Sequence, residues 1–200
     1  MQVLVLTIDQ RSSRRGPDLV PEALAALAAV PMLRPFERTA GDEFQGVLDD
    51  AAALAEVLEP LLRTEEWNVG LGLGPVELPL PAHARAGRGP AYVCAREAVT
   101  AAKSSPWHLR VVGDDERARH LESALWLWAA VLGRRTPKGW EVADLLERDL
   151  TYDEAARKLG ISQSAVSQRA RAAGIAEGRR GRELVGHLAA LLLTAPGADR

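Results

Sequence analysis

The sequence predicts an α+β protein in two parts, a ferredoxin-like N-terminal domain followed by an all-α helix-turn-helix domain. Strand and helix patterns alternate as β-α-β-β-α-β in the first half, and the later pattern is helical. Residues 1–133 carry 13 basic and 18 acidic side chains, whereas residues 134–200 carry 12 basic and 9 acidic ones. We therefore expect a domain over 1–114, a linking helix over 115–135 and a helix-turn-helix domain over 136–200.

The composition excludes several classes of protein. Of the 200 residues, 47% are apolar and 26% are charged, which is typical of globular chains and not of disordered or fibrous ones. The single cysteine, Cys94, excludes a disulfide framework and a cysteine zinc site, and it favours a reducing compartment. The first nine residues, MQVLVLTID, lack the positive start of a signal peptide, and no apolar stretch approaches the ~20 residues of a membrane span. We expect a cytoplasmic protein with no membrane partner.

Each element of the first domain has a local signal. The first strand is a run of leucine and β-branched residues, and the first helix is rich in alanine and ends before Pro31. Gly41-Asp42 is a hairpin turn signal between the second and third strands, and glycines alternate along the fourth strand. The predicted elements are strand 3–8, helix 21–30, strands 36–39 and 44–48, helix 51–62, strand 67–78, helix 91–103 and strand 108–112.

Two further helices carry apolar stripes that need a partner surface. In the linking helix, which begins at Glu116, the stripe has spacings of three and four. Near the C-terminus, leucines recur on one face of a terminal helix, where they would form a dimer contact or close the helical core. The stripes are Leu121, Leu125, Trp128 and Leu132 in the first helix, and Leu184, Leu188, Leu191 and Leu192 in the second.

Residues 151–174 show the start and stop signals of two short helices. Thr151 and Glu154 have capping-box spacing, and Gly160 supplies the left-handed residue that ends the first helix. Ser162 caps the second helix and Gly174 ends it. The segment TYDEAARKLGISQSAVSQRARAAGI resembles the helix-turn-helix of bacterial regulators and of sigma-factor region 4, which implies double-stranded DNA as a partner.

The second of these helices has one apolar and one polar face. At 100° per residue, Val166, Ala170 and Ala173 share the face that packs on the preceding helix. The opposite face carries hydroxyl, amide and guanidinium groups, which bind phosphates and base edges. An αα-hairpin that packs on another protein is the alternative. The predicted DNA contacts are Gln163, Ser164, Ser167, Gln168, Arg171 and Arg179.

Two aspartates and a basic loop form a candidate site in the first domain. Asp9 ends the first strand and Asp42 lies in the hairpin, so the two carboxylates converge if these strands are central neighbours. Such a pair suits Mg²⁺, which takes one or two carboxylates together with substrate phosphates. Arg11 and Arg14 follow the first strand among serines, where they would cradle phosphates or form a solvated basic loop.

Four segments carry a resemblance to a known family. TIDQRSSR, AGDEFQGVL, NVGLGLGPVEL and GRGPAYVCAREAV occur in the order and rough spacing of SatD-family proteins. AGDEF also resembles the GGDEF signature of diguanylate cyclases, and GLGLG is similar to a strand of class III nucleotidyl cyclases. The resemblance implies a palm domain like that of nucleotide cyclases, with catalytic metals at Asp9, Asp42 and Glu43.

The resemblance also implies what this chain lacks. Class III cyclases carry Asn-x-x-x-Arg, in which the asparagine orients the ribose and the arginine stabilises phosphate charge. Arg96 matches the arginine and is a predicted nucleotide contact, but Tyr92 replaces the asparagine and Ala40 replaces the first glycine of GGDEF. Binding of a nucleotide or of another phosphorylated ligand stays open, we expect no efficient cyclisation, and we identify no catalytic residue.

Together these patterns predict a homodimeric DNA-binding transcriptional regulator. Its palm-like domain would sense a ligand, such as a nucleotide, or mediate assembly. The alternatives are a Mg²⁺-dependent nucleotidyl-transfer enzyme that its helix-turn-helix targets, and an adaptor that binds proteins through its alanine-rich helices.

Overall fold

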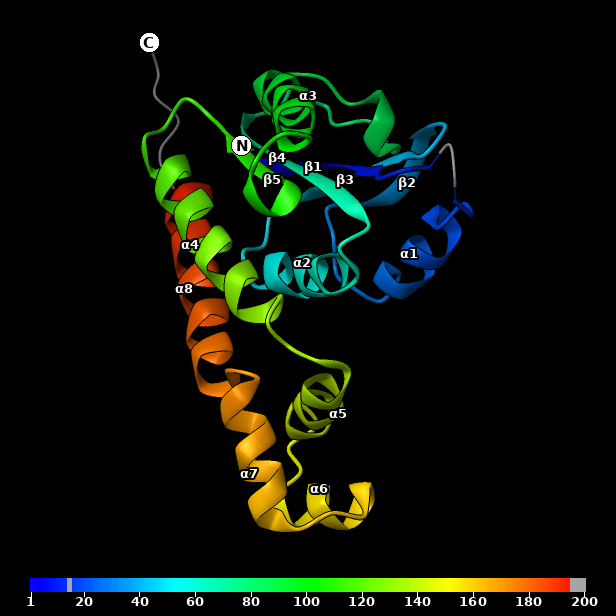
Figure 1. The fold of residues 1–200 in the computed structure, drawn as a ribbon. Helices are drawn as coiled ribbons and strands as arrows, with labels where there is room; N and C mark the ends of the chain where they lie inside the picture. The colour runs from blue at the N-terminus through cyan, green and yellow to red at the C-terminus, as the bar shows by residue number, and fades with distance from the viewer. Residues whose placement is uncertain (14–15, 195–200) are drawn as a thin grey trace.

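The computed structural model describes residues 1–13 and 16–194, which form one five-stranded sheet and a helical arm below it (Figure 1). The strand order is β2-β3-β1-β4-β5. The pairs β2–β3, β3–β1 and β1–β4 are antiparallel, and β4–β5 is parallel. The strands are β1 (Gln2–Gln10), β2 (Arg34–Ala40), β3 (Glu43–Leu48), β4 (Trp67–Pro75) and β5 (Leu109–Val112).

Helices cover both faces of the sheet. In Figure 1, α1 and α2 lie below the sheet and α3 lies above it. Alternate β1 side chains point to opposite faces of the sheet. Leu4 and Leu6 belong to the larger core with α2, and Val5 belongs to a smaller core with α3. The helices are α1 (Val20–Leu27), α2 (Ala52–Thr64), α3 (Pro90–Ala102), α4 (Arg117–Leu132), α5 (Pro137–Leu146), α6 (Tyr152–Leu159), α7 (Gln163–Ala172) and α8 (Ile175–Leu193).

The predicted α+β class and the β-α-β-β-α-β element order are confirmed, and the two largest differences in bounds among these elements lie at the ends of α1 and β4. The first helix ends at Leu27 instead of residue 30, because the position before Pro31 disfavours helical backbone. The fourth strand ends at Pro75 instead of residue 78, because Pro75 pairs with Gln2, where β1 begins, and no strand lies beyond. Helix α5 has no counterpart among the predicted elements.

The glycines of β4 let α3 lie directly on the sheet. A Cβ at Gly70 would stand 2.2 Å from the Val99 backbone nitrogen, and one at Gly72 would stand 2.1 Å from the Ala91 carbonyl oxygen. Because backbone cannot yield as a side chain does, any side chain there would force the helix off the strand. This close packing is the structural reason for the NVGLGLGP pattern.

Helices α4 and α8 run antiparallel, side by side, and join the sheet to the helical arm (Figure 1). The predicted stripe of α4 is buried, and its partner surface is α8, where Gly181 lies against the Trp128 ring. The leucines of α8 divide between two environments: Leu192 is buried, whereas Leu184 and Leu191 are exposed. No helix among the described residues has the length and apolar character needed to cross a membrane.

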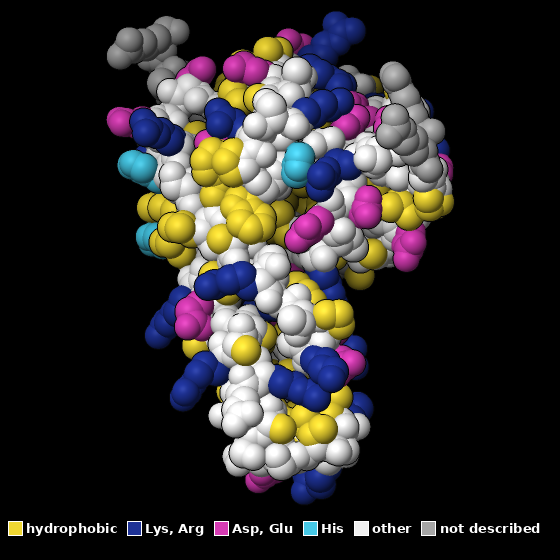
Figure 2. Space-filling model, viewed as in Figure 1, with side chains coloured by type: hydrophobic (Ala, Val, Ile, Leu, Met, Phe, Trp, Pro, Cys, Tyr) yellow, Lys and Arg dark blue, Asp and Glu magenta, His cyan; other side chains and the backbone are white. Residues whose placement is uncertain are grey.

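The arm itself consists of α5, α6, α7 and the first turns of α8. The predicted capping box between Thr151 and Glu154 is present, and Gly160 ends α6 with a φ of +64°. Ser162 caps α7 and Gly174 follows it with a φ of +60°. Figure 2 shows that Lys and Arg side chains outnumber Asp and Glu on the visible face of this arm.

Candidate functional site

A polar pocket of about 950 Å³ opens at the end of the sheet where β1 stops. The loop after β1, the β2–β3 turn, the start of β4 and the residues after α3 all contribute to its wall. Thus the predicted metal ligands Asp9 and Asp42 line one pocket, although they are far apart in sequence. The lining residues are Asp9, Gln10, Arg11, Ser12, Ser13, Gly16, Asp18, Gly41, Asp42, Asn68, Lys103 and His108.

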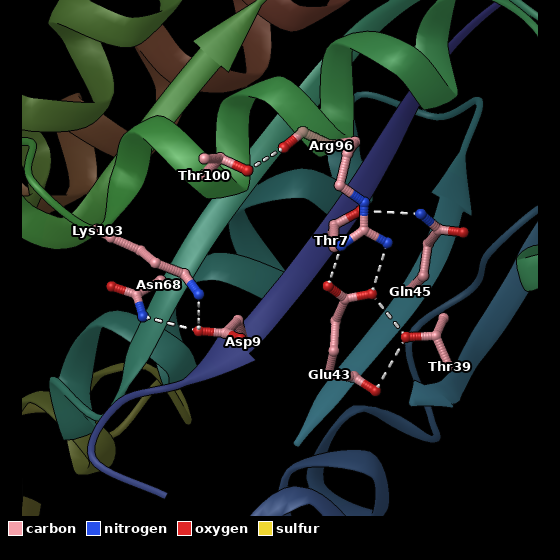
Figure 3. A network of polar contacts seen from close by, with 9 residues as sticks. All are labelled: Thr7, Asp9, Thr39, Glu43, Gln45, Asn68, Arg96, Thr100 and Lys103. Atoms are coloured by element: carbon pink, nitrogen blue, oxygen red, sulfur yellow. Dashed lines mark hydrogen bonds and ion pairs between the residues drawn. The ribbon is translucent and has the colours of Figure 1, made fainter. Parts of the chain in front are cut away.

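Asp9 already has partners within the protein (Figure 3). Its Oδ2 lies 3.2 Å from the Lys103 ammonium and accepts a hydrogen bond of 3.0 Å from the Asn68 amide. Lys103 directly follows α3, and Asn68 belongs to β4, the strand beside β1. The aspartate is therefore an ion-paired carboxylate in the wall of the pocket, oriented by Lys103 and Asn68.

Directly across the strand pair from Asp9 lies Glu43, not Asp42. Arg96 of α3 binds both Glu43 carboxylate oxygens, and the Thr39 hydroxyl donates a 2.7 Å hydrogen bond to Oε1 (Figure 3). The Glu43 side chain is only 12% exposed, and its hydrogen bonds raise the pKa of Arg96. Both cross-strand carboxylates thus receive a cation from the same helix, since residues 96 and 103 are two turns apart.

The predicted nucleotide contacts do not converge on the pocket. The Arg11 guanidinium donates to the Glu65 carbonyl at 2.5 Å, although Arg11 does line the pocket. Arg96 is held by Glu43 and is not among the lining residues, and Arg14 lies outside the described residues. Tyr92, at the position of the cyclase asparagine, packs in the small core under α3 with its hydroxyl against Gly87.

The predictions did not include Lys103 and His108. Lys103 carried a usable signal, since its seven-residue spacing from Arg96 puts both on one helix face. His108 carried none, because its position depends on a left-handed backbone: φ is +58° at Trp107 and +49° at His108. Burial and the nearby Arg11 guanidinium lower the pKa of His108. At neutral pH this histidine is therefore a neutral wall residue of the pocket.

Two of the three carboxylates that the resemblance implies as metal ligands already contact cations of the protein. Magnesium requires several oxygen ligands, whereas Asp9 Oδ2 already contacts Lys103 and Asn68, and both Glu43 carboxylate oxygens contact Arg96. Within residues 1–13 and 16–194, no group of three or more His, Cys, Asp or Glu side chains is arranged to hold a metal ion. A cation at Asp9 Oδ2 would compete with Lys103 and Asn68 for this oxygen.

The helix-turn-helix presents a second candidate site on α7. The predicted contacts Gln163, Ser164, Ser167, Gln168 and Arg171 are all exposed. At 100° per residue, Ser164, Gln168 and Arg171 lie opposite the buried Val166 and Ala170. Ser164 shares a 2.9 Å hydrogen bond with the Ser162 hydroxyl. Among the hydrogen bonds and ion pairs of the described residues, none involves the other four side chains.

Two arginines near this face have structural partners instead. Arg179, a predicted phosphate contact, donates a 3.0 Å hydrogen bond to the Leu146 carbonyl at the end of α5. Arg169, which stands where such motifs often carry an aliphatic residue, lies 3.7 Å from Glu141 of α5. Both side chains tie α7 or α8 to α5, so they help to fix the angle between these helices.

Comparisons with family models, with curated proteins and with solved structures gave no match to this chain. The chemistry of the pocket and of the α7 face is therefore the basis for a functional proposal.

Proposed function

We propose that this protein is a DNA-binding transcriptional regulator. The observation that carries the proposal is the exposed face of α7, where amide, hydroxyl and guanidinium groups project from a capped helix with few partners in the chain. Those groups match the donor and acceptor pattern of base edges in the major groove. The surrounding basic residues of the arm suit the phosphate backbone.

The strand order of the first region favours a known fold. We propose that residues 1–114 form a ferredoxin-like palm domain related to the SatD family. Support comes from the order β2-β3-β1-β4, from the central position of β1 and β3, and from two intervening helices on one face. The half-buried lone thiol, Cys94, supports a reducing, cytoplasmic location. A homodimer is part of the proposal, because paired recognition helices read two half-sites about one helical turn apart.

Selection of genomic fragments by the purified chain tests DNA binding. The wild-type protein should enrich a defined sequence, and the double variant Gln168→Ala with Arg171→Ala should lose about 1–3 kcal/mol for each base contact removed. The control is Arg119→Ala, which removes an exposed arginine from α4, far from the arm. Equal enrichment by the double variant and the wild type would exclude α7 as the recognition helix.

The pocket beside Asp9 favours a second function, the binding of a small polar ligand. Its serine hydroxyls, the Asn68 amide and the Lys103 ammonium are groups that bind phosphates. A nucleotide panel with and without Mg²⁺ should raise the melting temperature of the wild type and not that of Lys103→Met. Turnover of a nucleotide in the same mixtures would favour the nucleotidyl-transfer alternative.

A further inference from the structure

A cluster of charged and aromatic side chains lies where α2 of the first region meets the helical arm. We name it the junction cluster: Glu59 and Arg63 of α2, Arg135 of the α4–α5 connection, Trp140 of α5 and Arg182 of α8. The Glu59 carboxylate is buried, accepts a 3.4 Å hydrogen bond from Arg135 and is bound by Arg182. A single acidic side chain of the first region thus holds two arginines of the arm.

Arg135 extends this contact to the recognition helix. Its Nε donates a 3.1 Å hydrogen bond to the carbonyl of Ala173, the C-cap residue directly after α7. Its guanidinium also stacks on the Trp140 ring, with 4.5 Å from Cζ to the ring centroid. The Arg135 side chain is 3% exposed, so it contacts three elements at once and has no surface for DNA.

The Trp140 ring also contacts a guanidinium of the first region, that of Arg63. Arg63 lies 4.3 Å above the ring and forms two hydrogen bonds, of 2.8 and 3.0 Å, with Asp144 of the same helix. Helix α5 is therefore attached to α2 directly, while α7 is attached to α2 through Arg135. These contacts fix the orientation of the arm at two of its helices, α5 and α7.

Space for Arg135 depends on a glycine. A Cβ at Gly178, in the first turns of α8, would stand 2.3 Å from an Arg135 terminal nitrogen. Gly178 has no left-handed backbone that would itself require glycine. The missing side chain at this helical position therefore leaves room for the guanidinium, at the cost that glycine carries in a helix.

We propose that Arg135, oriented by Glu59, is a positioning residue that sets the sequence selectivity of DNA binding by fixing α7 relative to the rest of the molecule. The inference rests on the proposed DNA-binding function. Base contacts require the recognition helix to be placed within a fraction of an ångström, whereas contacts to phosphates tolerate displacement. Loss of the Arg135 link therefore reduces selective binding and leaves non-selective binding intact.

The buried pair of Glu59 and Arg135 is better explained by the orientation it gives to α7 than by a contribution to stability. Removing charged groups from water costs most of the free energy that their attraction contributes. Apolar side chains of the same volume would therefore stabilise the junction as well or better. Hydrogen bonds with fixed direction, in contrast, define one angle between α2 and α7. The pKa of Arg135 is lowered by burial, which marks the cost that this arrangement carries.

The test uses two glycines of the same helix. Gly178→Ala displaces the Arg135 guanidinium while it improves helix propensity, so the fold is expected to persist. Gly186→Ala is the matched control, because a Cβ there meets nothing within 4 Å. Glu59→Gln, a second variant of nearly equal shape, removes the charge that orients Arg135.

Binding of each full-length variant is measured on two duplexes, the fragment enriched by the wild type and a random sequence of the same length. The expected result for Gly178→Ala and Glu59→Gln is a loss of about tenfold on the enriched duplex, the effect of one misplaced base contact. Affinity for the random duplex and its dependence on salt stay unchanged, because phosphate contacts are intact. Gly186→Ala behaves as the wild type.

Other outcomes overturn the inference. Equal losses on both duplexes would show that the variants only lower the folded fraction, which thermal unfolding of each variant measures independently. Unchanged selectivity in both variants would show that Arg135 does not position α7. If the wild type enriches no sequence, the proposed function itself fails, and this inference fails with it.

Discussion

The pocket at the end of β1 and the exposed face of α7 contain similar side chains in opposite states. At the sheet, Arg96 and Lys103 are each bound to a carboxylate, and Arg11 is bound to a backbone carbonyl. On α7, the side chains of Gln168 and Arg171 form no hydrogen bond or ion pair among the described residues. The charged groups near the sheet are thus bound within the protein, whereas the donors of Gln168 and Arg171 on α7 have no partner among the described residues.

This difference follows from packing. Cross-strand carboxylates at the sheet are covered by α3, whose backbone rests on the glycines of β4, so each acid requires a cation from that helix. The apolar side of α7 is packed on α5 and α6, and no element within residues 1–13 and 16–194 covers its polar side. Arginine by itself is therefore a poor indicator of a binding site until its partners are known.

The largest expected effect concerns the close packing of α3 on β4. Gly72→Ala should lower the free energy of unfolding by about 3 kcal/mol, because its Cβ would overlap the α3 backbone. Gly74→Ala is the graded control, since its nearest contact is 3.1 Å away and it should cost less. Urea denaturation of both variants measures this, and equal losses would mean that α3 moves freely on β4.

A smaller effect tests the contrast between the two kinds of arginine. Arg96→Ala should cost about 1 kcal/mol of stability, because the mostly buried Glu43 carboxylate loses its cation while solvent screens part of the charge. Arg171→Ala should change stability by less than about 0.5 kcal/mol, as exposed substitutions do. Thermal unfolding of the two variants compares them, and the reverse order would contradict the assignment of roles.

The capping box of α6 predicts a weak dependence on pH within the arm. Hydrogen bonds from the Thr151 backbone N–H and hydroxyl lower the pKa of Glu154 in the folded protein. A lowered carboxyl pKa contributes stability above the unfolded value of about 4.3, and this contribution disappears as pH falls through the folded value. The melting temperatures of wild type and Glu154→Gln should therefore differ at pH 7 and converge near pH 3. A constant difference would show that the box does not depend on charge.

The smallest expected effect is an absence of cyclisation. Alignment of the ribose hydroxyl with the α-phosphate supplies about 7–11 kcal/mol of the barrier, and Tyr92 and Arg96 are both engaged away from the pocket. Incubation with ATP or GTP and Mg²⁺ or Mn²⁺ should yield no cyclic mono- or dinucleotide. Product formed at several turnovers per minute, and lost in Asp9→Asn, would establish the first region as an enzyme.

Local signals predicted much of this molecule correctly. The capping box, the left-handed Gly160 and Gly174, and the outward face of α7 depend on residues within one or two turns, so the sequence contains them directly. The order of strands and helices follows from hydrophobic periodicity in the same way. Helix α5 escaped prediction although its cap, Thr136, and the following Pro137 are helix-start signals.

By itself, the sequence determined the α+β class, the element order and the two short helices joined at Gly160, because each of these depends on the spacing of residues along the chain. Only the tertiary structure decided that Glu43, and not Asp42, lies across from Asp9, and that α3 supplies the cation to each of these carboxylates. The junction of Glu59 with Arg135 was equally invisible, since 76 residues separate the two side chains. Register and long-range partners are set by how whole elements pack, and no local pattern records them.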